Sequence, residues 1–231
     1  MKSFVNNIGK AAKGIHKSQK YFVAALIISI FLVNVNNSFA SILGKYYITK
    51  DSKIWVEGTS TVDDFSCFTY LVNGEAMLDS VPLMARIDNW KDASTKYFAD
   101  AFFNVKTKTL DCGKKMMNED MYDALKAEKF AFISFKVENV SLLSFDKTGK
   151  KSTVLVKGSL SIAGKTKPIN LEATISTIET DLRYRVQSSV KLNMKDFDIK
   201  PPQALFGLIK ANENITLFID LKVASDLYSK K

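Results

Sequence analysis

The sequence predicts a mainly β protein, an antiparallel barrel or sandwich, that carries one short helix. About eight segments place apolar residues at alternate positions, which is typical of strands with one buried face. A single segment spaces its apolar residues by four, and strands and helices do not alternate as a parallel sheet would require. The chain has 231 residues and contains neither an internal repeat nor a Pro/Gly/Ser-rich linker. We therefore expect one domain behind an N-terminal leader.

The N-terminus has the pattern of a secretory signal peptide. Several lysines precede an uncharged apolar run over residues 21–33, and Ser38 and Ala40 place small residues where a signal peptidase cleaves. The run is shorter than the roughly 20 residues of a transmembrane helix. We expect residues 1–40 to be a cleaved signal peptide, residues 41–231 to be the mature domain, and the protein to be periplasmic or secreted. An uncleaved N-terminal anchor is the alternative.

Cleavage would leave a mature chain without histidine, because His16 is the single histidine of the sequence. This excludes a Ser-His-Asp triad, a histidine general base and metal sites built on histidine. The formal charge of +9 would also fall to about +4 with the loss of the leader lysines, and a nucleic-acid partner normally requires a concentrated basic face. We predict no metal site and no nucleic-acid partner.

The two cysteines, Cys67 and Cys112, predict a disulfide. A small, even number of cysteines in an exported chain is typical of a structural bridge. This bridge would close a loop of about 45 residues, which the chain-entropy estimate values at roughly 4 kcal/mol. The alternative is two separate buried thiols.

The first strands are expected soon after the leader. Residues 45–48 and 53–61 alternate apolar and polar side chains, and from Phe68 to Leu78 the apolar residues occupy the even positions. Asn73-Gly74 within this stretch is also compatible with a tight hairpin turn, so it predicts either one bent strand or two short ones. Residues 97–110 are rich in aromatic and β-branched residues and predict the next strand.

The predicted helix covers residues 118–128. Asn118 is a good N-cap and is followed by two acidic residues, which suit the first turn. Met117, Met121 and Leu125 recur at a spacing of four and form one apolar stripe. A helix of this length is marginal in water, so the stripe must pack against other elements.

The second half of the chain predicts strands throughout. Acidic residues beside strand ends are interpreted as turn formers rather than as a carboxylate mechanism or a metal site. They are Asp63, Asp64, Asp196 and Asp198. The turn between two of the strands is expected over residues 163–166. Apolar residues alternate over residues 133–137, 154–162, 169–175, 184–192 and 215–223.

An ordered set of short motifs adds a family resemblance. The motifs are Gly58-Thr59-Ser60-Thr61, Leu110-Asp111-Cys112-Gly113, Ala124-Leu125-Lys126-Ala127-Glu128, Ile133-Ser134-Phe135, the hairpin over residues 156–169, and Lys195-Asp196-Phe197-Asp198-Ile199. Together they cover nearly all of the mature chain and resemble the YceI-like family of exported bacterial proteins, in its cysteine-bearing subgroup. The resemblance implies an antiparallel, eight-stranded, lipocalin-like barrel with one short helical insert at residues 110–128.

The resemblance also implies a function. It implies an internal apolar cavity that sequesters an isoprenoid or a similar long lipid, with no catalytic residues. We further expect no cofactor beyond the bound lipid, and only transient contact with a membrane. The sequence does not decide the oligomeric state, and a homodimer is one possibility. We expect residues 201–214 to form a flap over one barrel end, and the helix to wall the cavity mouth. The residues expected to line the cavity are Phe65, Tyr70, Phe103, Met121, Leu125 and Phe135.

Two other functions remain open at this stage. The aromatic residues could fill a packed core, which would make the protein a structural or adhesion module without a ligand. A hydrolase using Asp or Ser is the second alternative, but the chain has no G-x-S-x-G nucleophile elbow.

Overall fold

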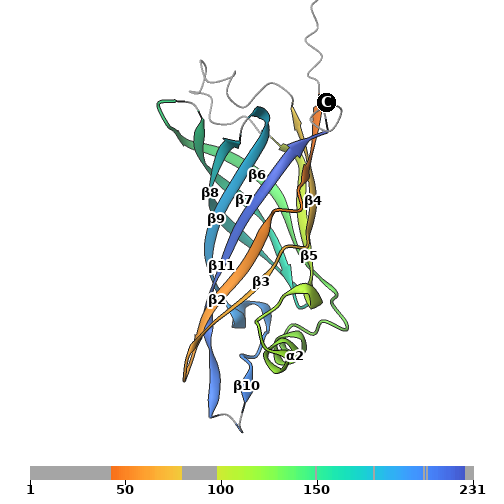
Figure 1. Cartoon of the computed structure of the whole chain (residues 1–231), viewed down its shortest axis with the longest axis vertical. Coiled ribbons are helices and arrows are strands. Elements are labelled where there is room, and N and C mark those ends of the chain that lie inside the picture. Colours follow the sequence, from red (N-terminus) through yellow and green to blue (C-terminus); the bar gives the residue numbers. More distant parts are fainter. Residues whose placement is uncertain are drawn as a thin grey trace, which may run out of the picture. The chain divides into compact units, whose positions relative to one another are not determined.

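The computed structural model describes residues 43–79, 98–148, 150–178, 180–204, 206 and 208–226. These residues form an antiparallel β barrel (Figure 1). They belong to one compact unit, Ser41–Lys231, and the predicted signal peptide lies outside the described residues. The strands of the barrel are β1 (Leu43–Ile48), β4 (Val72–Asp79), β5 (Phe98–Lys106), β6 (Phe132–Phe145), β7 (Lys151–Ile162), β8 (Lys165–Ile178), β9 (Thr180–Asn193) and β11 (Ile209–Ser225).

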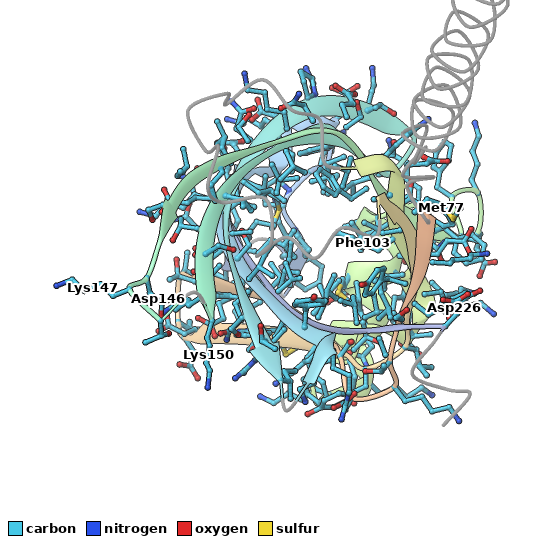
Figure 2. All side chains as sticks on the ribbon, turned by 90° about the horizontal axis from the view of Figure 1, so that it is seen from above. Met77, Phe103, Asp146, Lys147, Lys150 and Asp226 are labelled. Carbon is cyan, nitrogen blue, oxygen red and sulfur yellow. A yellow bond between two sulfur atoms is a disulfide. The ribbon has the colours of Figure 1, made fainter. Side chains whose placement is uncertain are left out.

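The strands close into the eight-stranded barrel that the resemblance implied. Their order is β1-β4-β5-β6-β7-β8-β9-β11, and β1 pairs with β11 through Tyr46↔Ser225 and two neighbouring pairs, which joins the two ends of the sheet. The compact unit therefore contains a complete barrel with its own core, which is what a domain needs to fold alone. Seen along the axis, Phe103 points into the barrel, whereas Asp146, Lys147 and Lys150 lie on its outside (Figure 2).

Two further strands extend the wall at one end. β2 (Lys53–Ser60) continues from β1 along β11, and β3 (Asp64–Thr69) forms a hairpin with β2 and leads into β4. The stretch from Phe68 to Leu78 thus contains the end of one strand and most of another. The break falls at residues 70–71, while Asn73 and Gly74 lie within β4, so these two residues do not form a hairpin turn.

Alternation of side chains builds the core as the sequence predicted. In β7, Val154, Leu160 and Ile162 are buried, and they share one face of the strand. The β7–β8 turn is shorter than expected, because Ala163 and Gly164 alone connect the strands. Both have positive φ (51° and 82°), which is the conformation of a type I′ hairpin.

The helix differs from its prediction at both ends. α2 covers Lys115–Ala124. Its N-cap is Lys114, whose side chain makes no capping hydrogen bond, and its C-cap is Leu125. It therefore starts three residues before the expected N-cap, Asn118, whose side chain has another role described below. The helices in the part of the chain that the structure describes are too short or too polar to cross a membrane.

Candidate functional site

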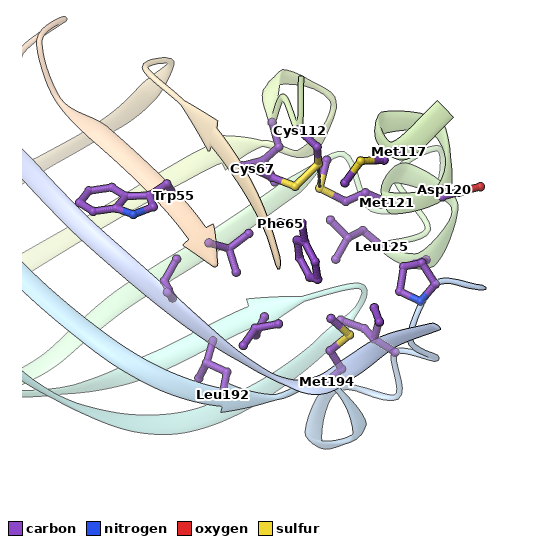
Figure 3. Close-up of a pocket in the computed structure, with 18 of the residues that line it drawn as sticks. Trp55, Phe65, Cys67, Cys112, Met117, Asp120, Met121, Leu125, Leu192 and Met194 are labelled. Atoms are coloured by element: carbon purple, nitrogen blue, oxygen red, sulfur yellow. Dashed lines mark hydrogen bonds between the residues drawn. A yellow bond between two sulfur atoms is a disulfide. The ribbon is translucent and has the colours of Figure 1, made fainter. Parts of the chain in front are cut away.

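An apolar cavity of about 380 Å³ lies at the end of the barrel that carries α2. Its walls come from the inner faces of the barrel strands, the β2–β3 hairpin, α2, the short 3-10 helix η4 (Met194–Phe197) and the hairpin of β10 (Gln203–Ala204) with β11 (Figure 3). The volume is within the range of about 300–1,000 Å³ that is typical of small-molecule sites.

The strand side of the cavity is aromatic and aliphatic. Phe103 is 8% exposed and contributes its ring from β5. Phe65 of β3 lies at the centre of the close-up (Figure 3). Its register partner on β2 is Gly58, and a Cβ atom there would lie 2.5 Å from the Phe65 ring. Glycine at position 58 therefore allows the Phe65 ring to lie across the neighbouring strand.

The helical side of the cavity is the apolar stripe that the sequence predicted. Met117, Met121 and Leu125 all line the cavity, together with Ala124. Tyr122 points to the other side, where its hydroxyl donates towards the carbonyl oxygens of Leu110 (2.7 Å) and Lys108. Burial raises the pKa of this hydroxyl, so it stays protonated and can donate at neutral pH.

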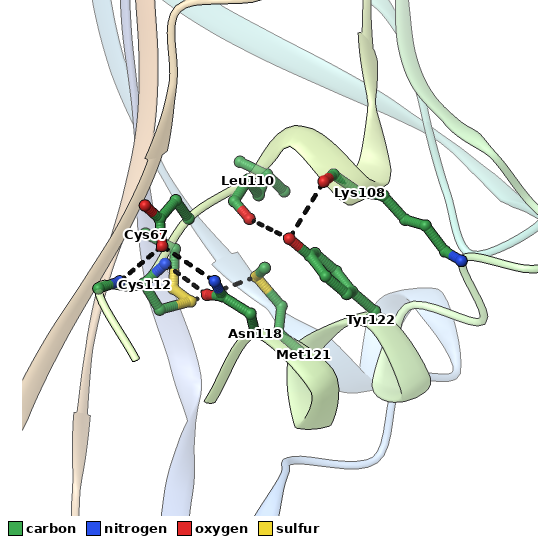
Figure 4. Close-up of a disulfide and its surroundings, with 9 residues drawn as sticks. Cys67, Lys108, Leu110, Cys112, Asn118, Met121 and Tyr122 are labelled. Atoms are coloured by element: carbon green, nitrogen blue, oxygen red, sulfur yellow. Dashed lines mark hydrogen bonds between the residues drawn. A yellow bond between two sulfur atoms is a disulfide. The ribbon is translucent and has the colours of Figure 1, made fainter. Parts of the chain in front are cut away.

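A disulfide fixes the helical insert to β3, as the cysteine count predicted. Cys67 is bonded to Cys112, and the backbone of Phe68 exchanges two hydrogen bonds of 2.9 Å with Asp111 next to it. The sulfur atom of Met121 lies 3.6 Å from Sγ of Cys112 (Figure 4). The bridge therefore joins the wall strand to the helix at the edge of the cavity.

Asn118 binds the loop that carries Cys112 instead of capping the helix. Its side-chain oxygen accepts a hydrogen bond from the backbone N–H of Cys112 (2.7 Å), and its amide nitrogen donates to the carboxylate of Asp111 (2.9 Å). The Asn118 amide, followed by the N–H of Gly113, lowers the pKa of Asp111. The cysteine loop is thus held in one conformation against α2 (Figure 4).

The mouth of the cavity carries the polar lining residues. Asp63 lies in the β2–β3 turn and Asp64 is the first residue of β3, and the N–H of Asp64 donates to the Asp63 carboxylate (2.8 Å). Lys114 and Asp120 lie on the side of α2, and Gln203 lies on β10. Asp63, Asp64, Lys114 and Gln203 are exposed, so the cavity opens between these three segments.

The other acidic pair is also a turn, as predicted. Asp198 ends η4 with a positive φ of 54°, and its carboxylate lies 2.7 Å from Nζ of Lys165. Lys165 lowers the pKa of Asp198. Within the described residues, no three His, Cys, Asp or Glu side chains are grouped closely enough to hold a metal ion.

Four of the six expected lining residues border the cavity, namely Phe65, Phe103, Met121 and Leu125. Tyr70 lies elsewhere, because it follows the end of β3 and its ring, 53% exposed, packs against Phe68 and the ammonium group of Lys53. The expectation that Tyr70 faces the cavity is therefore corrected.

Phe135 is the second correction. It is buried in the core, but its ring does not border the cavity. The ring packs on Phe103, with centroids 5.5 Å apart, and occupies the space above Gly158, where a Cβ atom would lie 2.5 Å from it. Phe135 therefore packs in the core against Phe103, which does line the cavity.

Several lining residues were missed by the sequence reasoning. Val62 and Met116 lie at the mouth, and Met194 of η4 and Ile209 of β11 lie across from α2. Of these four residues, only Ile209 lies within the flap expected over residues 201–214. The hairpin of β10 with β11, which belongs to that segment, does border the cavity. Val62 and Met116 lie outside any strand or helix stripe, so periodicity gives no indication of them.

Comparison with known proteins agrees with this geometry. A sequence profile of the YceI-like domain matches residues 57–223. BcnA of Burkholderia cenocepacia superposes with a TM-score of 0.55 at 14% identity, over 74% of this chain and 95% of that one. A polyisoprenoid-binding domain from Saccharophagus degradans, implicated in plant cell wall breakdown, gives a TM-score of 0.56 at 11% identity, over 78% and 98% of the two chains. At these identities the structural similarity establishes the fold. No curated protein sequence matches closely enough to add a relative.

Proposed function

This chain belongs to the YceI-like family, and we propose that it is a non-catalytic binding protein that takes a long apolar chain of the isoprenoid type into its barrel cavity. The observation that carries the proposal is the cavity itself. It is about 380 Å³ in volume, and most of the side chains that line it are apolar. The similarity to a polyisoprenoid-binding domain supports the same ligand class.

Burial of hydrocarbon supplies the affinity in this proposal. Each methylene or methyl group removed from water contributes about 0.8 kcal/mol, and an isoprenoid chain consists almost entirely of such groups. The apolar lining offers few hydrogen-bond partners, so the cavity selects for chain length and shape rather than for a polar group. Met117 and Met121 suit this task, because unbranched thioether side chains adapt to a chain that bends.

The polar mouth places the head group of the ligand in the same proposal. Asp63, Asp64 and Lys114 are exposed at the opening, so a polar head group would stay in water between them. The apolar tail would extend past Phe65 towards Phe103. Binding would require no bond to be made or broken, and we therefore assign no catalytic role to the carboxylates.

Export is the second part of the proposal. The basic leader, the apolar run over residues 21–33 and the Ser38-x-Ala40 pattern support a periplasmic or secreted protein that starts at Ser41. N-terminal sequencing of the protein from its native host tests this. A membrane-bound form that retains the leader lysines would contradict it.

Native mass spectrometry of the protein, purified gently from its native host, tests ligand binding. We expect an adduct whose mass corresponds to a long hydrocarbon chain. Ala124→Trp should remove the adduct, because an indole at this position projects into the cavity. Ala131→Trp, which places the same group on an exposed segment outside the lining, should retain it. Wild-type protein that never carries a lipid, and does not take up an isoprenoid alcohol added in vitro, would support a packed structural module instead.

A further inference from the structure

Four large apolar side chains are exposed on segments that border the cavity. Val62 and Met116 are each 67% exposed, Leu208 is 76% exposed, and Phe206 is fully exposed. They come from three separate segments, which are the β2–β3 turn, the first turn of α2 and the connection between β10 and β11. Figure 1 shows these three segments at the same end of the barrel. We call these four residues the apolar rim.

Hydrogen bonds hold two of the three segments together. Thr61 in the β2–β3 turn donates its backbone N–H to the carbonyl oxygen of Lys210 and its hydroxyl to the carbonyl oxygen of Leu208, both at 3.0 Å. The N–H of Lys210 donates back to the Thr61 hydroxyl at 3.2 Å. Val62 and Leu208 are therefore positioned by the same cross-link and do not depend on independent loops.

The rim adjoins the cavity. Val62 and Met116 are exposed to water and also line the cavity, so part of the rim adjoins the apolar lining of the cavity. Exposure of four large apolar side chains on segments that border one cavity is costly in water unless another apolar phase covers them. A ligand that moves along this surface would expose less of its hydrocarbon chain to water.

We propose that the apolar rim inserts into the interfacial region of a phospholipid bilayer and opens the cavity towards the membrane. The surface consists of projecting tips on separate segments, which fits a deformable lipid phase better than a flat protein partner. The proposal rests on the proposed function for its purpose, since the ligand would pass between bilayer and cavity. The docking itself requires only the rim.

The charges next to the rim define the kind of bilayer. The segments that carry the rim contain Asp63, Asp64, Glu119 and Asp120 together with Lys114, Lys115 and Lys210, and Lys115 pairs with Glu119. Acidic and basic groups on these segments are therefore close to balance. This balance gives the rim no net basic charge with which to select anionic lipids. Docking would rely on apolar burial, would occur on zwitterionic phosphatidylcholine, and would depend little on salt.

Flotation with phosphatidylcholine vesicles tests the docking, with Ser41–Lys231 used so that the apolar leader is absent. Phe206→Ser/Leu208→Ser removes two rim side chains that project into water, so folding should be unaffected. Each buried side chain of this size contributes about a tenfold change in partitioning, and we expect the double variant to bind about 100-fold more weakly. Leu143→Ser is the matched control, because Leu143 is 52% exposed near the far end of β6, away from α2 (Figure 1). This control should bind as the wild type does.

Three results would overturn the proposal. The first is vesicle binding that is equal in the wild type and the rim variant. The second is binding that requires anionic phosphatidylglycerol and disappears in 0.5 M salt, where the screening length is about 4 Å. The third is a variant that differs from the wild type only by loss of a homodimer, measured by analytical ultracentrifugation without vesicles. The proposed function fails separately. A wild type that floats with vesicles but carries no lipid in native mass spectrometry would retain the docking and reject the carrier.

Discussion

Truncation of Leu125 to alanine separates a cavity wall from the cap of a solid core. A leucine in a packed core loses its transfer free energy and also leaves a void, for a total of about 2–5 kcal/mol. Leu125 is only partly buried and one side of it faces an existing cavity, so it has fewer packing partners to lose. We expect Leu125→Ala to lower the free energy of unfolding by about 1 kcal/mol, close to half of a full leucine transfer.

Leu171→Ala is the matched control. Leu171 is 4% exposed, belongs to the main core, and does not border the cavity. Truncation there should cost about 2–5 kcal/mol. Urea unfolding of Ser41–Lys231 measures both values, and the slope of the transition should be the same in both variants if the unfolded state is unchanged.

Leu171→Ala should have the larger effect on stability, whereas Leu125→Ala should have the larger effect on the rate of ligand release. Leu125→Ala removes apolar contact with the bound chain, which we expect to cost about 1–2 kcal/mol of binding and to speed dissociation of a fluorescent isoprenoid probe roughly 5- to 30-fold. Leu171→Ala should leave probe release unchanged. If Leu125→Ala destabilises the protein as much as Leu171→Ala does and leaves probe release unchanged, then α2 caps a solid core and the reasoning is refuted.

Three further predictions concern the barrel. Replacing Cys67 and Cys112 by serine should lower the free energy of unfolding by about 2–4 kcal/mol, because the bridge closes a 45-residue separation, and urea midpoints equal to those of the wild type would contradict this. Gly158→Ala should cost about 1–3 kcal/mol by overpacking, since its Cβ would lie 2.4 Å from a backbone carbonyl oxygen that cannot rotate away; a calorimetric melting temperature within one degree of the wild type would exclude the clash. Hydrogen bonds from Arg185 (2.7 and 2.6 Å) lower the pKa of Asp220, so their stabilisation is present above the normal carboxyl pKa and is lost as the pH falls below it. The stability difference between wild type and Asp220→Asn should therefore shrink below about pH 4, and a difference that is equal at pH 7 and pH 3 would show that ionisation of Asp220 is not involved.

Local pattern was sufficient for the strands and for the stripe on the helix. In β7 the buried residues fall at alternate positions for almost the whole strand, because one face packs in the barrel and the other meets solvent. Met117, Met121 and Leu125 line one cavity because helical residues four apart lie on one face. These features depend on neighbours in sequence, and sequence periodicity reports them directly.

The errors arose where a distant residue decided the outcome. Asn118 has the side chain of an N-cap, but the backbone of Cys112 and the carboxylate of Asp111 hold it in the cysteine loop, and the helix begins earlier. Phe135 has the correct parity for the barrel interior, but the missing side chain of Gly158 on β7 leaves a space that its ring fills. Neither partner could be assigned before the strand register was known.

The position of Tyr70 shows a third reason. Parity along a strand predicts which face a residue occupies only while the strand continues, and β3 ends at Thr69 while β4 starts at Val72. The count of alternate positions restarts across the break. Tyr70 therefore lies outside with Phe68 and Lys53, although the even positions on either side suggested one continuous face.

The cavity follows from the way the wall is built at this end of the barrel. Neighbouring strands lie about 4.8 Å apart, whereas a helix with its side chains is about 10 Å across. Beyond Asp111, which is the isolated bridge partner of Phe68, the wall beside β3 is formed by α2. Met117, Met121 and Leu125 of this helix line the cavity, and Met121 and Leu125 also pack against the edge of the main core. The ladder of backbone hydrogen bonds that would join a strand to β3 is replaced by one bridge and the disulfide next to it. The Cys67–Cys112 bond thus lies where strand pairing beside β3 ends and α2 continues the wall of the cavity.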